Sequence, residues 1–336
     1  MSAALHVRFL SADDVARLVP SPAEAIDAIE DVVRAQGEGE VVLEPRVHLE
    51  PGAEFRGHWN VLRTYVRPLG AAGVKVVGDF VDNYTRGLPS ELGLVTLFDP
   101  ETGAPTAIVD AELITSLRTG ALTAVGAKHL ARADSRVLGH IGARGTAFWN
   151  VVLLDSLFAF DEIRVTSARA ESRDAFGRRL EERLGKPVRV VESVREAVEG
   201  ADVVVEATRL LEPEPILRTA WLADGAFVVP YGTMSAVELD LLDAIDKVVV
   251  DDWEQCKPGG RFGALREHVD RGLLTRESLY AELGEIVAGR KPGRERPDER
   301  ILFWHRGLAS CDLALADLLL RRADEAGVGT TLLYRS

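Results

Sequence analysis

Val137-Leu-Gly-His-Ile-Gly142-Ala-Arg-Gly-Thr-Ala147 is the stretch that decides the fold. A short apolar run ends at Gly142, a glycine-rich turn follows, and the residues from Ala147 onward are mostly apolar, as in a strand that passes through a tight turn into a helix. In such a turn, backbone N–H groups and the positive end of the helix dipole suit a pyrophosphate. The stretch therefore predicts a dinucleotide-binding turn, with an ordinary tight turn as the alternative.

The alternation of strand and helix continues from about residue 136 to residue 251. Parallel strands joined by crossover helices give this pattern. The apolar runs are VLGHIG, EIRVTS, VRVV, DVVVEA, AFVVPYG and KVVVDD, and the intervening helix candidates include 170–184 and 193–198. We therefore predict an α/β fold in which residues 126–301 form a Rossmann domain, a doubly wound parallel sheet.

The two ends of the chain follow a different pattern. A helix is expected over 22–36, strands around Val41, 61–66, 74–80 and 94–98, and an amphipathic helix over 312–326. We predict that residues 1–125 and 302–336 come together in a second, α+β domain. By its composition, the segment 290–298 is expected to be a solvated loop.

Composition narrows the class of partner. Among 336 residues there are 40 basic and 53 acidic side chains, and the net charge of −13 opposes binding to nucleic acid or to an anionic membrane. The two cysteines, Cys256 and Cys311, match neither a disulfide framework nor a metal-ligand spacing, and no His/Cys/Asp cluster suggests a metal. Since the sequence shows no export signal and no apolar run of about 18 residues, we expect a cytoplasmic protein.

The glycine-rich turn departs from the usual dinucleotide fingerprint G-x-G-x-x-G/A at one place. Gly142 and Ala147 fit its first and third positions, but Arg144 replaces the second glycine, which normally lets the backbone approach the pyrophosphate. Either the guanidinium of Arg144 reaches a phosphate, or its bulk obstructs the site, with Gly145 restoring some clearance. We expect cofactor contacts from Gly142, Arg144, Gly145, Thr146 and Ala147.

The residues at the end of the second strand indicate whether NAD or NADP is the expected cofactor. About twenty residues after the turn, a NAD-selective domain presents an acidic residue to the ribose diol. Here the segment reads Arg164-Val-Thr-Ser-Ala-Arg169, without a carboxylate. Ser167 and Arg169, helped by Ser172 or Arg173, would instead hold a 2′-phosphate, which favours NADP over NAD. The alternative is that these are ordinary exposed arginines.

Three cations stand out as candidate substrate ligands. Lys75, one of six lysines, lies in the strand-like Gly73-Val-Lys-Val-Val77, where a desolvated ammonium needs an anionic or carbonyl partner. Arg118 interrupts the apolar and small residues of Ile114-Thr-Ser-Leu-Arg-Thr-Gly-Ala121, and its planar fork suits a carboxylate. Arg46 is a third cation of this kind. An outward-facing lysine on a half-exposed strand is the alternative for Lys75.

An ordered set of motifs resembles the ornithine cyclodeaminase/mu-crystallin family. The resemblance spans the chain from about Arg46 to Gly327 and is more specific than the glycine-rich turn alone. Its motifs are Gly73-Val-Lys-Val-Val77, Arg86-Gly-Leu-Pro-Ser90, Leu97-Phe-Asp-Pro-Glu-Thr-Gly103, Leu117-Arg-Thr-Gly-Ala121, the Gly142 turn, Ala201-Asp-Val-Val-Val-Glu-Ala-Thr208, Glu238-Leu-Asp240 and Gly307-Leu-Ala309.

The resemblance implies a homodimer whose chain ends form a substrate-binding and dimerisation domain around an inserted NAD(P)-binding Rossmann domain. It implies hydride transfer at an amino or imino carbon, which is imine reduction or amino-acid dehydrogenation. Arg46, Lys75 and Arg118 would then hold the substrate carboxylate or polarise the reacting centre. The residues expected near the cofactor on this basis are Ser90, Arg118, Thr119 and Thr208.

Two departures from the family pattern affect the chemistry expected. The cyclodeaminases have an aspartate a few residues before the Glu-Leu pair, where this chain has Gly232 or Thr233. A carboxylate general base is therefore missing from that place. The second departure puts His305 and Arg306 before Gly307, and His305 is either a proton-exchanging catalytic residue or a packed histidine.

Two other functions stay open beside an NAD(P)-dependent oxidoreductase of small amino or imino acids. One is a lyase of the ornithine cyclodeaminase type, which the missing aspartate disfavours. The other is a non-catalytic accessory subunit of an amine oxidase that kept the fold, in line with Arg144 and the unusual Trp304-His-Arg306.

Overall fold

The structure is a computed structural model that describes residues 4–143, 145–258, 260 and 262–336. Two compact units emerge: unit 1 is Met1–Arg118 with Leu308–Ser336, and unit 2 is Thr119–Gly307. The helix α3 (Glu112–Leu130) contains the first boundary. The two boundaries of unit 2, after Arg118 and after Gly307, each lie a few residues from those predicted from the sequence, which were 125/126 and 301/302. None of the helices in the described part of the chain is long and apolar enough to cross a membrane.

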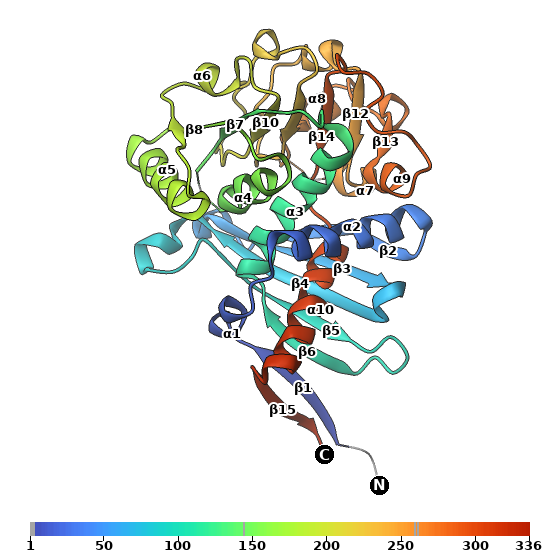
Figure 1. Cartoon of the computed structure of the whole chain (residues 1–336). Helices are drawn as coiled ribbons and strands as arrows, with labels where there is room; N and C mark the ends of the chain where they lie inside the picture. The colour runs from blue at the N-terminus through green and yellow to red at the C-terminus, as the bar shows by residue number, and fades with distance from the viewer. Residues whose placement is uncertain (1–3, 144, 259, 261) are drawn as a thin grey trace. The chain divides into compact units, whose positions relative to one another are not determined.

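Unit 1 is built on a seven-stranded sheet of order β15-β1-β6-β5-β4-β3-β2, antiparallel except between β1 and β6 (Figure 1). Its strands are β1 (Leu5–Leu10), β2 (Val41–Leu49), β3 (Gly57–Val66), β4 (Ala71–Phe80), β5 (Glu91–Phe98), β6 (Pro105–Asp110) and β15 (Thr330–Arg335), and its helices, with the first turns of α3, are α1 (Ala12–Arg17), α2 (Pro22–Glu38) and α10 (Ala309–Ala326).

The helices α2 and α10 pack together, and α10 lies along strands β2 to β5. The start of α2 is encoded locally, because Ser21 and Glu24 form a reciprocal capping box and Pro22 opens the first turn. The helix α10 approaches β4 closely at Gly73, where a Cβ would lie 2.9 Å from the Leu313 side chain. This contact explains the glycine next to Lys75 on the covered face of the strand.

The other face of the unit 1 sheet exposes apolar side chains. Val76 of β4 lies opposite Leu94 of β5, and both are exposed. Apolar residues along β2 and β5 are exposed as well, namely Val42, Val47, Leu49 and Leu92. We call this surface the outer face of the sheet. A contiguous exposed apolar patch of this kind marks an interaction surface.

Unit 2 is built on an eight-stranded parallel sheet of order β13-β12-β14-β11-β10-β7-β8-β9. Its strands are β7 (Val137–Ile141), β8 (Glu162–Thr166), β9 (Arg189–Val190), β10 (Val203–Glu206), β11 (Phe227–Pro230), β12 (Lys247–Val250), β13 (Ala281–Glu282) and β14 (Ile301–Trp304), and its helices, besides α3, are α4 (Ala147–Phe158), α5 (Ala170–Leu184), α6 (Val194–Val198), α7 (Trp253–Cys256), α8 (Arg266–Asp270) and α9 (Leu283–Val287).

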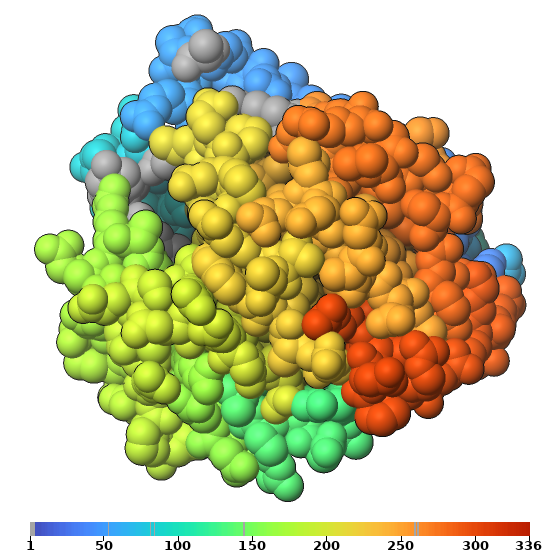
Figure 2. Space-filling model, turned by 90° about the horizontal axis from the view of Figure 1, so that it is seen from above, coloured from blue at the N-terminus to red at the C-terminus, as the bar shows by residue number. Residues whose placement is uncertain are grey.

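Helices cover both faces of this sheet, as a doubly wound fold requires. On one face, Gly126 of α3 lies against Phe303, and His140 of β7 contacts Phe176 of α5. On the other face, Gly139 approaches the carbonyl of Ala197 in α6. Figure 2 looks onto unit 2, where the yellow to orange segments that follow β10 in the chain cover the middle of the surface. The α/β Rossmann fold predicted from the sequence is therefore confirmed.

The segment after residue 300 joins the sheet of unit 2. We expected residues 302–336 to belong with the N-terminal domain, but Ile301–Trp304 is strand β14, parallel to its neighbours β11 and β12. The chain passes to unit 1 only after Gly307. An apolar run shows that a strand forms, but not which sheet it joins.

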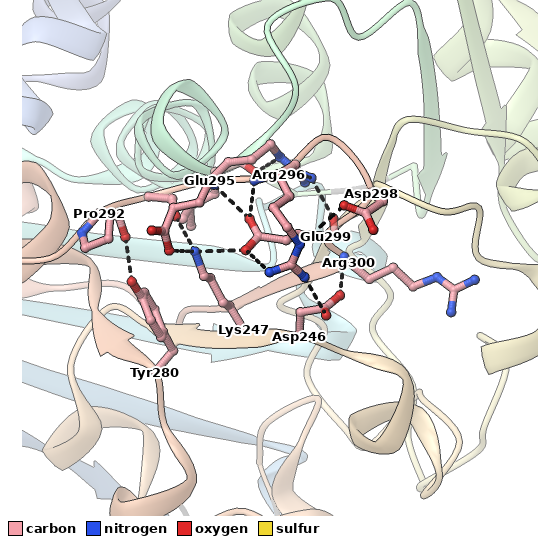
Figure 3. Close-up of polar contacts among 12 residues, drawn as sticks. Asp246, Lys247, Tyr280, Pro292, Glu295, Arg296, Asp298, Glu299 and Arg300 are labelled. Atoms are coloured by element: carbon pink, nitrogen blue, oxygen red, sulfur yellow. Dashed lines mark hydrogen bonds and ion pairs between the residues drawn. The ribbon is translucent and has the colours of Figure 1, made fainter.

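The segment 290–298 is mostly exposed, as its composition indicates, and ion pairs also hold it to the start of β12 (Figure 3). Lys247, the first residue of β12, donates to the carbonyl of Gly293 at 2.7 Å and pairs with Glu295 at 2.7 Å and with Glu299 at 3.1 Å. Arg296 pairs with Asp246 at 3.3 Å. Because these contacts lie at the amino ends of β12 and β14, they are far from the glycine-rich turn and hold the fold.

Candidate functional site

Strand β4 places Lys75 in the interior of unit 1. Side chains alternate along a strand, so Lys75 shares the covered face with Val77 while Val76 lies on the outer face. Its neighbours across the sheet are Leu62 of β3 and Val95 of β5, both buried. The Lys75 side chain is 0% exposed. The lysine therefore points inward among apolar residues, and the outward-facing alternative does not apply.

A buried aspartate joins two of the predicted cations. Asp312, in the first turn of α10, accepts at Oδ1 from Lys75 Nζ at 2.7 Å and from Arg118 Nε at 3.0 Å. Thr115, one helical turn before Arg118 on α3, accepts from Lys75 Nζ at 3.3 Å. Sequence reasoning missed Asp312 because it lies 237 residues from Lys75. Its only local signal is an acidic residue among the apolar and small residues of the first turns of an amphipathic helix.

This cluster contains two cationic side chains, Lys75 and Arg118, but only one carboxylate, that of Asp312. The pKa of Lys75 is lowered to about 8, because burial and the Arg118 guanidinium lower it and Asp312 and Glu91 offset only part of these effects. Two cations share one carboxylate oxygen, and Asp312 Oδ2 is buried without a hydrogen bond among the described residues. The cluster thus holds an excess of positive charge. Its carboxylate oxygen Asp312 Oδ2 can accept a further hydrogen bond.

Arg46, predicted for the substrate, and Ser90, predicted near the cofactor, lie on β2 and directly before β5. Arg46 lies in β2, at an irregularity in the pairing with β3 between Glu44 and Val47. Ser90 directly precedes β5, and its carbonyl accepts from Phe80 N at 2.8 Å.

Two histidines and an asparagine on β2 and β3 lie close to one another. The rings of His48 and His58 lie 5.5 Å apart, and Asn60 Nδ2 is 3.2 Å from His58 Nε2. These side chains come together because β2 pairs with β3, which puts His48 opposite Asn60. Across the described residues, no group of three His, Cys, Asp or Glu side chains is arranged to hold a metal ion.

In unit 2, the glycine-rich turn between β7 and α4 contains two glycines with positive φ. Gly142 has a φ of 111°, and a Cβ there would lie 2.6 Å from the carbonyl oxygen of Ala207. Gly145 has a φ of 57°, Thr146 is the N-cap of α4, and Ala147 begins the helix. Only glycine fits the Gly142 conformation, and α4 presents its N-terminal N–H groups here. Arg144 lies outside the described residues.

The residues predicted to choose between NAD and NADP follow strand β8. Ser167 comes directly after β8, and Arg169 is the N-cap residue of α5. Arg173 Nη1 lies 3.5 Å from the carbonyl of Ser167. Ser167 is partly buried and Arg169 is exposed, so this edge presents a hydroxyl and guanidinium groups where an acidic residue is expected for NAD.

His305 lies in unit 2, whereas Lys75 lies in unit 1. It is buried, its Nε2 is 3.0 Å from Thr123 Oγ1, and its ring stacks on Tyr231 with centroids 5.0 Å apart. Tyr231 Oη is in turn 2.9 Å from both Thr146 Oγ1 and Asn150 Nδ2. The histidine is therefore packed and hydrogen-bonded through side chains, and Thr123 also donates to the carbonyl of Thr119 at 3.2 Å.

A carboxyl group lies where the sequence predicted none. Gly232 carries no side chain, but the Glu206 carboxyl of the neighbouring strand lies against it, and a Cβ at Gly232 would be 2.5 Å from each Glu206 oxygen. Thr208 donates to Glu206 through its N–H and its hydroxyl. Residues 232 and 233 supply no carboxylate, as predicted, but strand pairing brings the buried Glu206 carboxyl group of β10 against Gly232.

Comparisons place the chain among known proteins. The sequence model of the ornithine cyclodeaminase/mu-crystallin family matches residues 6–327. The ketimine reductase mu-crystallin of Rattus norvegicus is 32% identical over 313 residues, covering 93% of this chain and 96% of the rat protein.

Two solved structures match over nearly the full length. The Δ1-pyrroline-2-carboxylate reductase of Thermococcus litoralis, in complex with NADH and L-proline, is 31% identical with a TM-score of 0.90, and the match covers 96% of this chain and 99% of that one. An archaeal alanine dehydrogenase dimer with bound NAD is 31% identical with a TM-score of 0.88, and the match covers 98% of this chain and 100% of that one.

Proposed function

This chain belongs to the ornithine cyclodeaminase/mu-crystallin family, and we propose that it is an oxidoreductase that moves hydride between a nicotinamide dinucleotide and a small amino or imino acid. The relatives described above are a ketimine reductase, a pyrroline-2-carboxylate reductase and an alanine dehydrogenase, which all act at a carbon bonded to nitrogen. Unit 1 binds the substrate in this proposal, and unit 2 binds the cofactor.

The observation that carries the substrate assignment is the charge of the buried cluster. Lys75 and Arg118 share the single oxygen Asp312 Oδ1, so the three residues hold one net positive charge below the pKa of Lys75. An excess buried charge is costly unless it is paired, and a substrate carboxylate supplies the missing anion. Arg46 adds a further cation on β2. An iminium or ammonium N–H is a suitable donor to Asp312 Oδ2.

Lys75 can also carry a proton in this reaction. Reduction of an imine requires a proton at nitrogen, and a group whose pKa lies near the working pH exchanges protons most effectively. Burial brings the pKa of Lys75 to about 8, well below that of an ordinary lysine. We therefore assign Lys75 Nζ two tasks: orienting the substrate, and holding or releasing a proton there.

The residues of unit 2 fit a dinucleotide. Gly142, Gly145, Thr146 and Ala147 form the turn and helix start that would hold the pyrophosphate. When bound, the nicotinamide supplies or accepts the hydride. Within unit 2, His305 and Tyr231 order the edge of the sheet beside this turn, and His305 is assigned a positioning role because it is buried and packed.

We assign a preference for NADP over NAD. Support comes from Ser167, Arg169 and Arg173, which offer a hydroxyl and two guanidinium groups at the end of β8. The two relatives with bound cofactor described above carry NADH and NAD, so the assignment for this chain rests on these residues alone. Measured affinities for NADPH and NADH decide it, since tighter binding of NADH would contradict the assignment.

The protein is a homodimer in this proposal, formed through the outer face of the unit 1 sheet. The apolar side chains of β2, β4 and β5 on that face are exposed in the single chain, among them Val42, Val76 and Leu94. Burial of such a patch stabilises association. The archaeal alanine dehydrogenase described above is a dimer.

The experiment that tests the function mixes purified protein and NADPH or NADH with cyclic imino acids, then with amino acids and the oxidised cofactor. We expect a substrate-dependent change in the absorbance of the reduced cofactor, and Arg118→Ala should lose it. Release of ammonia from ornithine without net cofactor turnover would instead indicate the cyclodeaminase-type lyase. Failure to bind either cofactor would favour an accessory subunit, although no relative described above is an amine oxidase subunit.

A further inference from the structure

Glu206 lies at the centre of the carboxyl edge of the unit 2 sheet. It is the last residue of β10 and pairs with Ile141 of β7 on one side and Pro230 of β11 on the other. The glycine-rich turn therefore begins at Gly142, one residue after Ile141, which is the neighbour of Glu206 on β7. A Cβ at Gly142 would lie 2.6 Å from the carbonyl oxygen of Ala207 and 3.3 Å from Thr208 N, so the turn packs directly on the segment that follows Glu206.

The carboxyl group of Glu206 joins the loops that follow β10 and β11. Its Oε1 accepts from Thr208 N at 2.7 Å and from Thr208 Oγ1 at 2.5 Å, and its Oε2 accepts from Gly232 N at 3.2 Å. Any side chain at residue 232 would collide with it, because a Cβ there would be 2.5 Å from both oxygens. The carboxyl group is 0% exposed. Glu206 thus sets the geometry of both loops beside the phosphate-binding turn.

Among the residues that the structure describes, no cation pairs with the Glu206 carboxyl group, whose partners are Thr208 and Gly232. Burial raises its pKa to about 7, and the hydrogen bonds from Thr208 and Gly232 offset only part of that effect. His140 on β7 pairs with Val205 and so faces the opposite side of the sheet, and burial lowers its own pKa to about 4. The loop after β10 carries Arg209, and β11 leads into Tyr231. Within the described part of the chain, burial is therefore the main cause of the raised pKa of Glu206.

We propose that binding of a nicotinamide dinucleotide to unit 2 is coupled to uptake of one proton by Glu206, which acts as a positioning residue for the cofactor. This inference rests on the proposed function, because it requires a dinucleotide at the glycine-rich turn. A pyrophosphate brings negative charge to that turn, and a buried carboxylate one residue away from it in the sheet opposes this charge. The protonated carboxyl group removes the repulsion.

The Thr208 hydroxyl links the proton to the cofactor. When Glu206 is ionised, this hydroxyl donates its only proton to Oε1. When Glu206 carries a proton, the acid O–H can donate to the hydroxyl oxygen, and the Thr208 proton becomes available to a ligand. Without the added proton, the Thr208 hydroxyl donates to Glu206. Once Glu206 has taken up a proton, this hydroxyl can donate to the cofactor instead.

Titration calorimetry with NADPH and NADH tests this coupling. We measure the dissociation constant between about pH 6 and about pH 9, and the protons taken up by comparing two buffers of different ionisation enthalpy. The wild-type dissociation constant should rise about tenfold per unit of pH above about 7, with uptake approaching one proton. Glu206→Gln should bind without this pH dependence. Glu212→Gln, in the same loop at an exposed residue, is the matched control and should behave as wild type.

The outcomes separate the inference from the proposed function. Binding of equal strength across this pH range, with no proton taken up by the wild type, overturns the inference and leaves the oxidoreductase assignment intact. A dissociation constant that depends on pH in the same way in Glu206→Gln also overturns the inference and leaves the oxidoreductase assignment intact. Absence of binding at every pH overturns the proposed function and the inference together. The wild-type measurement decides the question by itself if the Glu206→Gln variant does not fold.

Discussion

Replacing Asp312 with asparagine tests the buried cluster of unit 1. Asp312→Asn keeps the shape of the side chain and removes its charge, while Lys75 at 2.7 Å and Arg118 at 3.0 Å stay in place. The substitution leaves two buried cations without their shared carboxylate. Removal of one partner from a buried ion pair costs about 3–5 kcal/mol, because the remaining charge is uncompensated.

The pH dependence of this loss follows from Lys75. With Asp312 present, burial already lowers its pKa from 10.5 to about 8, and without Asp312 it falls further. The variant can therefore relieve the repulsion by releasing the lysine proton. At about pH 6.5 the wild-type cluster is fully charged, so the loss of unfolding free energy should be near its full value. At about pH 9 Lys75 is mostly neutral in the wild type as well, so the loss should be smaller.

Urea unfolding at the two pH values measures these differences, and hydrogen exchange of peptides from β4 and α10 assigns them to unit 1. The matched control is Asp317→Asn on the same helix, where Asp317 pairs with Arg321 at 3.0 Å on a largely exposed surface. Such an exposed pair contributes about 0–1 kcal/mol. An Asp312→Asn variant no less stable than Asp317→Asn at low pH would refute the reasoning.

Three further predictions follow from the same structure. The unfolding free energy should rise by about 3 kcal/mol from about pH 8 to pH 10.5, because unfolded Lys75 keeps its proton longer than folded Lys75, and denaturation of Lys75→Met should lack this rise. Lys247→Met should cost about 3–5 kcal/mol in urea titrations by leaving buried Glu299 without its lysine, and an unchanged midpoint would contradict this. Val76→Glu should convert the proposed dimer into monomers in sedimentation experiments, whereas Leu273→Glu, at an exposed residue of unit 2, should not.

Local sequence patterns predicted most elements of unit 2. The expected helix 170–184 coincides with α5 (Ala170–Leu184), and the stretch ending at Gly142 forms β7 and its turn. These succeed because strand and helix periods and turn glycines are local properties. Strand β14 was misplaced because its sheet partners are β11 and β12, and pairing across such distances leaves no trace in the run ILFW.

Candidate cations could be found from the sequence, but their partners could not. Lys75 and Arg118 stand out because a charge interrupts an apolar stretch, whereas the Asp312 that joins them comes from the other end of the chain. Glu206 is visible as an acidic residue ending an apolar strand. Its contact with Gly232 depends on the pairing of β10 with β11, so the sequence indicated a missing carboxylate where the fold supplies one.

Transfer of deuterium tests the central claim most directly. NADPH that carries deuterium at both hydrogen positions of the reactive carbon of its nicotinamide is incubated with the purified protein and the cyclic imino acid that gives the fastest turnover. Mass spectrometry of the amino-acid product should show one deuterium, bonded to the carbon that carried the C=N bond, because the hydride passes directly from cofactor to substrate. A product without deuterium, or no product from any imino or amino acid in the presence of bound cofactor, would contradict the assignment of this chain as a hydride-transferring oxidoreductase.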